Sequence, residues 1–262
     1  MRRFRLFEFI DLPWYPPVFR GIQTDYLQFV ATRGSGQAGL VPLLIEAMQH
    51  TGTTEIVDLC SGGAGPWKLL QRQLADAGWP VGIMLTDKYP HPAALRQWAA
   101  TSQPSVGYVP EPVDALDVPP SLKGMRTLFE SFHHFAPSDA ESILRDAFEK
   151  RVAIGVFDVR VPRRWAPIPM VLAPFSTVLG YLFMTPFITP RSWSRLLWTY
   201  LIPVVPLATC WDGVVSLLRV YSPPELEAMT VPLRASDYTW DIGTACTGTP
   251  IFEYVYLVGY PI

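Results

Sequence analysis

The sequence has few cysteines and few histidines, which limits the metal and redox chemistry that it can support. Only three of its 262 residues are cysteines, Cys60, Cys210 and Cys246, and no two of them form a CxxC pair. Of the four histidines, neither His50 nor His91 has a partner at metal-ligand spacing. We therefore expect no metal site. Scattered thiols suit small buried side chains in a reducing compartment, so a cytoplasmic location is predicted.

An excess of positive charge is also missing. Charged residues make up 17% of the chain, and the formal net charge is -2. Nucleic-acid-binding proteins usually carry a basic surface that attracts phosphates over a distance, so neither DNA nor RNA is the expected partner. The first residues begin like a secretory signal, but Glu8 and Asp11 interrupt the apolar run and no small-residue cleavage site follows. The segment is therefore predicted to belong to the folded protein.

Strand-like and helix-like segments alternate from residue 37 onwards. Short apolar runs typical of buried strands lie at 54–59, 81–87, 105–115, 125–135 and 151–161. Helical patterns lie between them at 37–50, 66–78, 91–100 and 138–150. Regular alternation of this kind predicts an α/β fold with a parallel, doubly wound sheet.

The turn after the first predicted strand is rich in glycine. The sequence from Ile56 to Trp67 reads IVDLCSGGAGPW, in which Gly62, Gly63 and Gly65 leave the backbone open to close approach. In a doubly wound sheet this turn faces the ligand. A P-loop is excluded, because no GK[ST] sequence follows the glycines.

Acidic residues end three successive predicted strands. They are Asp58, Asp87 and Asp114, with Asp117 as an equal candidate for the third position. Asp87 is placed to accept hydrogen bonds from two ribose hydroxyls, and Asp114 is placed to accept one from an adenine amino group. Three acids suit a nucleoside with a cationic amino-acid tail better than a pyrophosphate. S-adenosylmethionine is therefore the predicted cofactor, with S-adenosylhomocysteine as its product.

These motifs resemble those of the class I S-adenosylmethionine-dependent methyltransferases, a group that includes the ubiquinone and menaquinone biosynthesis methyltransferases. VDLCSGGAG corresponds to the first motif, TDKYP to the acid after strand two and VDALDVP to the segment beside adenine. LFESFHHF corresponds to the fourth-strand motif, and YTWDIGTACTGTPIFEYVYLVGYP resembles the antiparallel hairpin that ends this fold. The similarity covers about residues 37–160 and 218–262.

The resemblance implies a Rossmann-like sheet of seven strands with strand seven antiparallel, and an enzyme that transfers methyl groups. It extends the expected cofactor site to Lys88, Ala115 and Ser131. Cys60 stands in this turn where the family usually has glycine, so the turn is expected to open differently there. No neighbouring group in the sequence argues for a reactive thiol, and Cys60 is interpreted as a packing residue of the cofactor turn.

Two adjacent histidines follow the fourth predicted strand. A neutral imidazole is a good general base near pH 7, so His133 and His134 are the candidate catalytic residues. In the family that the chain resembles, such a pair also packs against the cofactor or the next helix. That alternative stays open for at least one of them.

A hydrophobic insertion interrupts the predicted fold. Residues 168–190 contain no charged residue and are long enough to cross a bilayer, but Pro169, Pro174 and Pro186 divide them. We predict short proline-broken helices that form a lid over the substrate, with peripheral membrane contact or spanning helices as alternatives. The expected organisation is an aromatic-rich cap (1–36), a methyltransferase domain (37–162 and 213–262) and the lid (163–212).

The lid aromatics are expected to line a chamber for a hydrophobic small molecule. They are Trp165, Phe175, Tyr181, Phe183, Phe187, Trp193, Trp198, Tyr200 and Trp211. Such a wall would stabilise a cationic product by about 0.5 to 2 kcal/mol per ring, which favours C-methylation of an indole, phenolic or isoprenoid natural product. O-methylation of a lipophilic substrate, and a membrane-associated nucleotide- or lipid-binding protein without activity, remain the alternatives. The apolar lid also makes a homodimer conceivable.

Four residues are candidates for contact with the substrate: Tyr26, Trp165, Tyr200 and Asp212. A carboxylate beside so apolar a run is costly unless it is paired or functional. Asp212 therefore either binds the substrate or pairs with Arg219. Arg20 and Tyr26 are further candidates to cover the methionine carboxylate of the cofactor.

Overall fold

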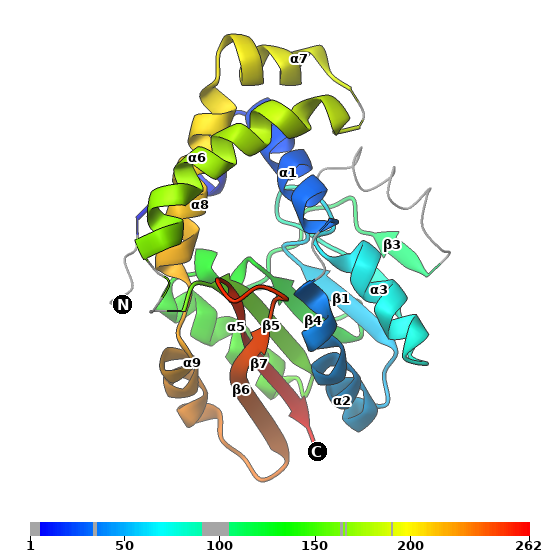
Figure 1. Ribbon diagram of the computed structural model, residues 1–262. Coiled ribbons are helices and arrows are strands. Elements are labelled where there is room, and N and C mark those ends of the chain that lie inside the picture. The colour runs from blue at the N-terminus through cyan, green and yellow to red at the C-terminus, as the bar shows by residue number, and fades with distance from the viewer. Residues whose placement is uncertain (1–5, 34–35, 91–104, 163–164, 166, 190) are drawn as a thin grey trace.

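A seven-stranded sheet forms the centre of the molecule (Figure 1). The computed structural model describes residues 6–33, 36–90, 105–162, 165, 167–189 and 191–262, so the helix predicted at 91–100 lies outside the described residues. The strands are β1 (Glu55–Leu59), β2 (Gly82–Leu85), β3 (Val106–Tyr108), β4 (Met125–Phe129), β5 (Ile154–Arg160), β6 (Tyr238–Cys246) and β7 (Glu253–Pro261). Their order is β3-β2-β1-β4-β5-β7-β6, and β7 runs antiparallel to both of its neighbours. The predicted doubly wound sheet is confirmed.

Helices cover both faces of this sheet. On one face lie α2 (Val41–Thr51) and α3 (Trp67–Asp76), and on the other lie α5 (Pro137–Glu149) and α9 (Pro223–Thr230). Successive side chains of β1 enter opposite cores, Ile56 the first and Val57 the second. The strand therefore reads as a continuous apolar run.

A further layer stands at the carboxyl ends of the parallel strands (Figure 1). It consists of α1 (Pro17–Ala31), α6 (Pro167–Met184), α7 (Trp193–Leu196), a π-helical turn (Leu197–Leu201) and α8 (Val204–Arg219). A small core joins α1, α6 and α8, and in it the ring of Tyr26 stacks on that of Tyr181 with centroids 3.8 Å apart. We call residues 167–219 the lid.

The lid is less broken by proline than the sequence indicated. Helix α6 continues for 18 residues with Pro174 inside it, because one missing backbone donor does not end a helix that is packed on its neighbours. The break comes at Thr185–Phe187, a short 3-10 turn that contains Pro186. Helix α8 runs through residue 212, where the predicted lid was to end.

Candidate functional site

The glycine-rich turn links the end of β1 to α3. Four of its residues have positive φ angles: Cys60 at 56°, Gly62 at 52°, Ala64 at 79° and Gly65 at 43°. Glycine adopts this left-handed region freely, whereas other residues are strained there. Cys60 thus keeps a glycine-like backbone conformation, and the expectation that the turn opens differently at this residue is not supported.

Asp87 lies directly against this turn. Its Oδ2 accepts a hydrogen bond from the Gly62 N–H at 2.8 Å, and its Oδ1 accepts one from the Tyr89 N–H at 2.7 Å. A carboxylate oxygen has two lone pairs, so both oxygens keep capacity to accept further donors. The acid after β2 and the turn after β1 therefore lie together, and their role in binding a cofactor stays a prediction.

Asp114 is joined to the same site through Lys88. The Lys88 ammonium lies 2.7 Å from Asp114 Oδ2, and the Val113 N–H donates to the Asp87 carbonyl. This ion pair holds the pKa of Asp114 below its usual value, although burial alone would raise it. Ala115 is buried in the second core, so only its backbone can meet a ligand. The structure brings Lys88 and Asp114 together beside Asp87, and their contact with a cofactor stays a prediction.

Asp58 is bonded to the neighbouring strand β4. Its side chain is only 2% exposed, and its Oδ1 accepts a hydrogen bond from the Thr127 hydroxyl of β4 at 2.7 Å. Burial raises the pKa of Asp58 to about 6, although the hydrogen bond from Thr127 opposes this shift. The carboxyl group therefore braces β1 against β4, and its direct contact with a ligand stays a prediction.

Gly63 makes room for the protein itself. A Cβ atom at this position would lie 2.8 to 3.0 Å from side-chain atoms of Gln28 on α1. Among the described residues, a Cβ added at Gly62 would meet the Thr24 methyl group at 3.8 Å, and one added at Gly65 would have no atom within 4 Å. The sequence predicted that a ligand approaches Gly63 closely, but Gln28 occupies that position. Gly62 and Gly65 have more room around them.

Two polar residues, Glu130 and Ser131, follow β4, and of these Ser131 is buried. Ser131 is 5% exposed, and among the described residues its hydroxyl has no hydrogen-bond partner. Glu130 has a positive φ angle of 49°, and its side chain is exposed. An unpaired buried hydroxyl is costly, so Ser131 is suited to meet a ligand at this strand end.

Comparisons with known proteins bear on the fold alone. No protein-family model and no curated protein matches the chain. Among the solved structures that resemble it is PigF with S-adenosylhomocysteine, at 15% identity and a TM-score of 0.53, covering 95% of this chain and 63% of PigF. Human N-acetylserotonin methyltransferase with S-adenosylmethionine matches at 12% identity and 0.48, covering 90% and 56%. An O-methyltransferase family protein from Burkholderia thailandensis matches at 14% and 0.47, covering 86% and 56%.

The strand order and the antiparallel β7, together with the match to PigF, decide the fold. The chain has the class I methyltransferase fold. In the first matches, this chain spans between 43% and 63% of the other protein's length. A fold hosts many functions, so function must be argued from the site.

On this methyltransferase fold the two histidines have different partners. His133 is buried, and its Nδ1 lies 3.1 Å from Asp158 Oδ1 on β5. A carboxylate accepts only, so Nδ1 carries the proton and Nε2 is left as an acceptor, which has no hydrogen-bond partner among the described residues. His134 Nδ1 lies 2.7 Å from Asp11 Oδ1. Burial alone would lower the pKa of His134, but Asp11 and Glu8 raise it above its usual value.

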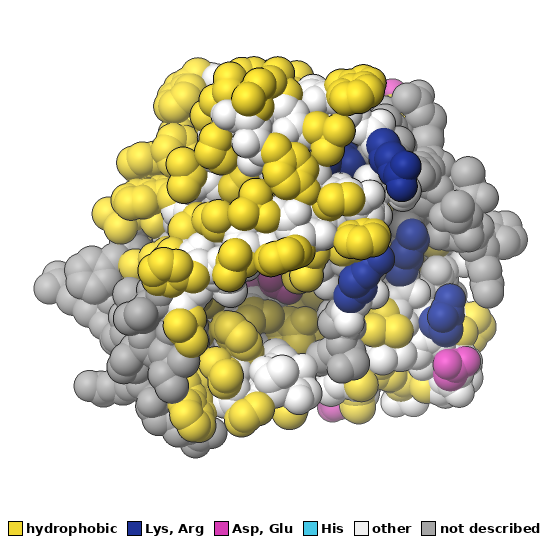
Figure 2. Space-filling view, turned by 45° about the horizontal axis from the view of Figure 1, so that its top comes forward, with side chains coloured by type: hydrophobic (Ala, Val, Ile, Leu, Met, Phe, Trp, Pro, Cys, Tyr) yellow, Lys and Arg dark blue, Asp and Glu magenta, His cyan; other side chains and the backbone are white. Residues whose placement is uncertain are grey.

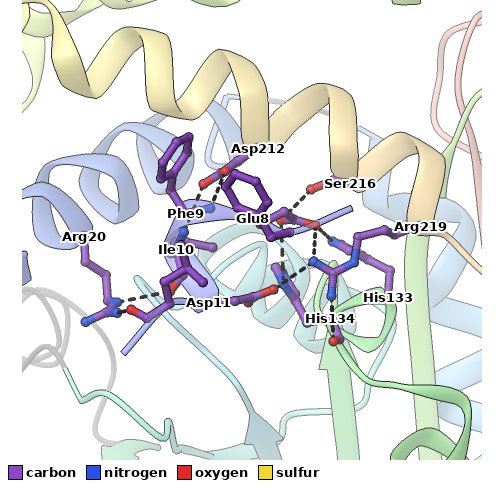
Figure 3. A network of polar contacts seen from close by, with 12 residues as sticks. Glu8, Phe9, Ile10, Asp11, Arg20, His133, His134, Asp212, Ser216 and Arg219 are labelled. Carbon is purple, nitrogen blue, oxygen red and sulfur yellow. Dashed lines mark hydrogen bonds and ion pairs between the residues drawn. The ribbon is translucent and has the colours of Figure 1, made fainter. Parts of the chain in front are cut away.

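A buried ion network attaches the N-terminal segment to the methyltransferase fold (Figure 3). Glu8 is 1% exposed and accepts hydrogen bonds from the Arg219 guanidinium at 2.9 Å and the Ser216 hydroxyl at 3.0 Å. Arg219 also binds Asp11 at 2.8 Å and the His134 carbonyl at 2.7 Å. Ion pairs and hydrogen bonds of Arg219 thus link the end of α8 to the N-terminal segment and to the turn after β4.

Asp212 does not pair with Arg219. Its two oxygens accept hydrogen bonds from the backbone of Phe9 and Ile10 and from Gln23 Nε2, at 2.7, 3.2 and 2.7 Å. Burial raises the pKa of Asp212 against the lowering effect of these bonds. The carboxylate anchors the N-terminal segment, so the predicted pair with Arg219 is wrong, and contact with a substrate stays a prediction.

The other predicted substrate residues are not gathered at one place. Tyr26 packs inside the lid core, and the Tyr200 hydroxyl, on an exposed side chain, donates to the Leu182 carbonyl. Trp165 is partly buried, and its indole Nε1 has no partner among the described residues. Arg20 donates to the Leu12 carbonyl, and its guanidinium lies 4.4 Å from the centre of the Tyr89 ring. Arg20 thus contacts the residue whose backbone N–H donates to Asp87.

The lid aromatics mostly face outward, which corrects the predicted chamber. Tyr181 is fully buried, but six of the nine are exposed: Phe175, Phe183, Phe187, Trp193, Tyr200 and Trp211. Figure 2 shows hydrophobic side chains over the outer surface of the lid, and a hollow beneath it in which acidic and hydrophobic side chains lie. An apolar composition cannot tell which side of a helix is covered, and here the outer side carries most of the large rings.

Several residues of this site were missed from the sequence. Glu8, Asp11, Gln28 and Asp158 are distant along the chain from the motifs that they contact. Asp158 had a detectable signal, because it is a lone acid inside an otherwise apolar strand, and a buried acid requires a partner. The other three carried no local signal.

Proposed function

We propose that the chain binds S-adenosylmethionine at the turn after β1 and transfers its methyl group to a hydrophobic small molecule. The observation that carries this proposal is the hydrogen bond from the Gly62 N–H to Asp87, which joins an open glycine backbone to an acid at the next strand end. The Lys88 and Asp114 pair continues the same edge. A nucleoside with a charged tail fits a site that combines carboxylates with a turn in which Gly62 and Gly65 leave room for a ligand.

The residues present fit this cofactor. Asp87 would accept from the ribose hydroxyls, Asp114 and the backbone at Ala115 would lie beside the adenine, and the Ser131 hydroxyl would gain the partner that it lacks. Gly62 and Gly65 leave the space that a Cβ would occupy. The cofactor, when bound, supplies a methyl group on a positively charged sulfur.

His133 is the candidate base for this transfer. Asp158 accepts the hydrogen bond of Nδ1, so Nε2 could take the proton of a substrate hydroxyl when a bound cofactor supplies its methyl group. The Nε2 atom lies 4.0 Å from Glu8 Oε1, so the N-terminal segment forms one wall of this position. His134, paired with Asp11, is the residue that fixes that wall.

This arrangement favours oxygen over carbon as the methylated atom. The argument for C-methylation rested on aromatic rings around the substrate, and most of those rings face outward. A buried imidazole with a free acceptor instead suits a nucleophile that must lose a proton. We therefore propose a lipophilic hydroxyl compound, such as a phenolic or isoprenoid molecule, as the substrate class.

Binding of S-adenosylhomocysteine tests the proposal. At a hundredfold excess over its dissociation constant it should stabilise the fold by about 2.7 kcal/mol, seen as a higher melting temperature. The Asp87→Ala variant should lose this stabilisation, whereas Asp76→Ala, at an exposed acid at the end of α3, should keep it.

The result also separates the enzyme from its alternative. If the donor's product binds but no labelled methyl group reaches any lipophilic hydroxyl compound, the chain is a binding protein. If neither the product nor the donor alters the melting temperature, the proposed site is wrong. Replacement of His133 by Gln should abolish transfer while leaving the stabilisation by S-adenosylhomocysteine in place.

A further inference from the structure

The outer surface of the lid is covered by hydrophobic side chains. Of the 26 large hydrophobic side chains that are exposed among the described residues, fifteen lie between residues 172 and 211. We call them the lid face: Leu172, Phe175, Leu179, Leu182, Phe183, Phe187, Trp193, Leu196, Leu197, Tyr200, Leu201, Ile202, Val204, Leu207 and Trp211. Apolar patches of this extent on a protein surface mark an interaction site.

The exposed side of α8 is hydrophobic, and its buried side carries charged residues among apolar ones. Its inward side carries the charged Asp212 and Arg219, both buried and bonded to the N-terminal segment. Its outward side carries Leu207 and Trp211, which are exposed. In a helix that faces water the polar side is outermost, so the outer side of α8 is suited to an apolar medium.

The lid face carries almost no charge. Residues 172–211 contain two charged side chains, Arg191 and Arg195, and no carboxylate. Arg195 is buried and paired with Asp25, which leaves Arg191 as the exposed charge of the segment. Figure 2 shows further Lys and Arg side chains along one border of the hydrophobic surface. The face is therefore apolar with a positive border.

Two occupants could cover such a face, and its charge distinguishes them. A second copy related by a two-fold axis would bring the same patch against itself, so Arg191 would meet no carboxylate from its partner's lid segment. A bilayer offers hydrocarbon for the rings and negative headgroups for the positive border. Tryptophan and tyrosine, as at Trp193, Tyr200 and Trp211, are typical of the boundary between hydrocarbon and water.

The helix lengths argue for docking on the surface of the bilayer. Among the described residues, no single helix is long and apolar enough to cross a membrane. One bent pair, residues 193–201 followed by Val204–Arg219, reaches that length and composition together, with an angle of 75° between its parts. Its second part has a charged inner side, which is bonded to the rest of the protein.

We propose that the lid face docks on the surface of a bilayer that contains anionic lipids, with its rings in the boundary region and its positive border on the headgroups. This inference does not depend on methyl transfer. If the proposed function is also correct, a substrate dissolved in the bilayer would reach the hollow beneath the lid from the membrane side (Figure 2).

Sedimentation with vesicles tests the docking. The probe is vesicles of phosphatidylcholine mixed with phosphatidylglycerol, and the lid variant carries Phe187→Glu and Trp193→Glu. These side chains are 70% and 87% exposed, so the fold should be unaffected, which circular dichroism checks. The control carries Val231→Glu and Ile262→Glu, two exposed hydrophobic positions after α9 and at the C-terminus, away from the lid (Figure 1).

Wild type and control should bind these vesicles, and the lid variant should bind at least about tenfold more weakly. Vesicles of phosphatidylcholine alone should bind wild type more weakly than the anionic mixture. The proposal is overturned if wild type stays in the supernatant, or if the lid variant sediments as wild type does. It is also overturned if light scattering shows a wild-type dimer that the lid substitutions dissociate, while vesicles bind neither protein.

Discussion

Removal of the Arg219 guanidinium should destabilise the protein more than most single substitutions would. The Arg219 side chain is 4% exposed and that of Glu8 is 1% exposed, with 2.9 Å between the guanidinium and the carboxylate. Arg219→Met leaves Glu8 buried with the Ser216 hydroxyl as a neutral donor. Breaking a buried ion pair from one side costs about 3 to 5 kcal/mol, because the remaining charge is uncompensated.

A double-mutant cycle separates this cost from loss of packing. Glu8→Gln keeps the shape and an acceptor for Ser216 while it removes the charge. The Glu8→Gln and Arg219→Met double variant should therefore lose at least about 1 to 2 kcal/mol less than the sum of the two single losses. Asp11 and His134 also contact Arg219, so part of the stability lost in Arg219→Met will also be lost in the double variant.

The assay is urea unfolding followed by tryptophan fluorescence at pH 8. At lower pH, protonated His134 would replace some of the missing positive charge and would reduce the measured coupling. The reasoning is refuted if Arg219→Met costs less than about 1 kcal/mol, or if the two losses simply add. In either case the network would contribute little to the free energy of unfolding, as exposed ion pairs do.

Three further predictions follow from the site. Gly63→Ala should lower the melting temperature because its methyl group meets Gln28, and Gln28→Ala should restore part of the loss; an unchanged melting temperature would count against the contact. Burial raises the pKa of Asp58 from 3.8 to about 6, so wild type should lose stability relative to Asp58→Asn as the pH rises. In urea unfolding the loss should be about 1 kcal/mol at pH 4.5 and about 3 kcal/mol at pH 7. A difference between the two proteins that does not change with pH would refute this. The pKa of His134 is raised in the folded state, so the contribution of this residue to the free energy of unfolding is complete below pH 6.5. That contribution is lost as the pH rises through the folded-state pKa, and His134→Gln should remove this loss in the same assay.

The sheet and one half of the site could be predicted from the sequence because they depend on local signals. The strand that ends in Asp87 is a short apolar run, and parallel strands place their carboxyl ends at one edge of the sheet. The contact between Asp87 and the glycine turn follows from that rule alone.

The other half depends on contacts between distant segments, for which the sequence has no local signal. Glu8 and Arg219 are separated by 211 residues. The side of the lid that carries its rings was predicted wrongly, because hydrophobic composition does not distinguish a lining from an outer face. A signal was present in α8, where Val205, Asp212 and Arg219 recur at helical spacing and so share the buried side.

The helix that carries Gln28 meets two parts of the molecule at once. Gln28 fills the space over Gly63, and two residues earlier the ring of Tyr26 is stacked on the lid residue Tyr181. Any movement of α1 that uncovers the glycine turn must therefore separate or carry the lid with it. If the chain is an enzyme of the proposed kind, one movement of α1 would both release S-adenosylhomocysteine and admit a new substrate. The order in which the two ligands leave would then depend on α1.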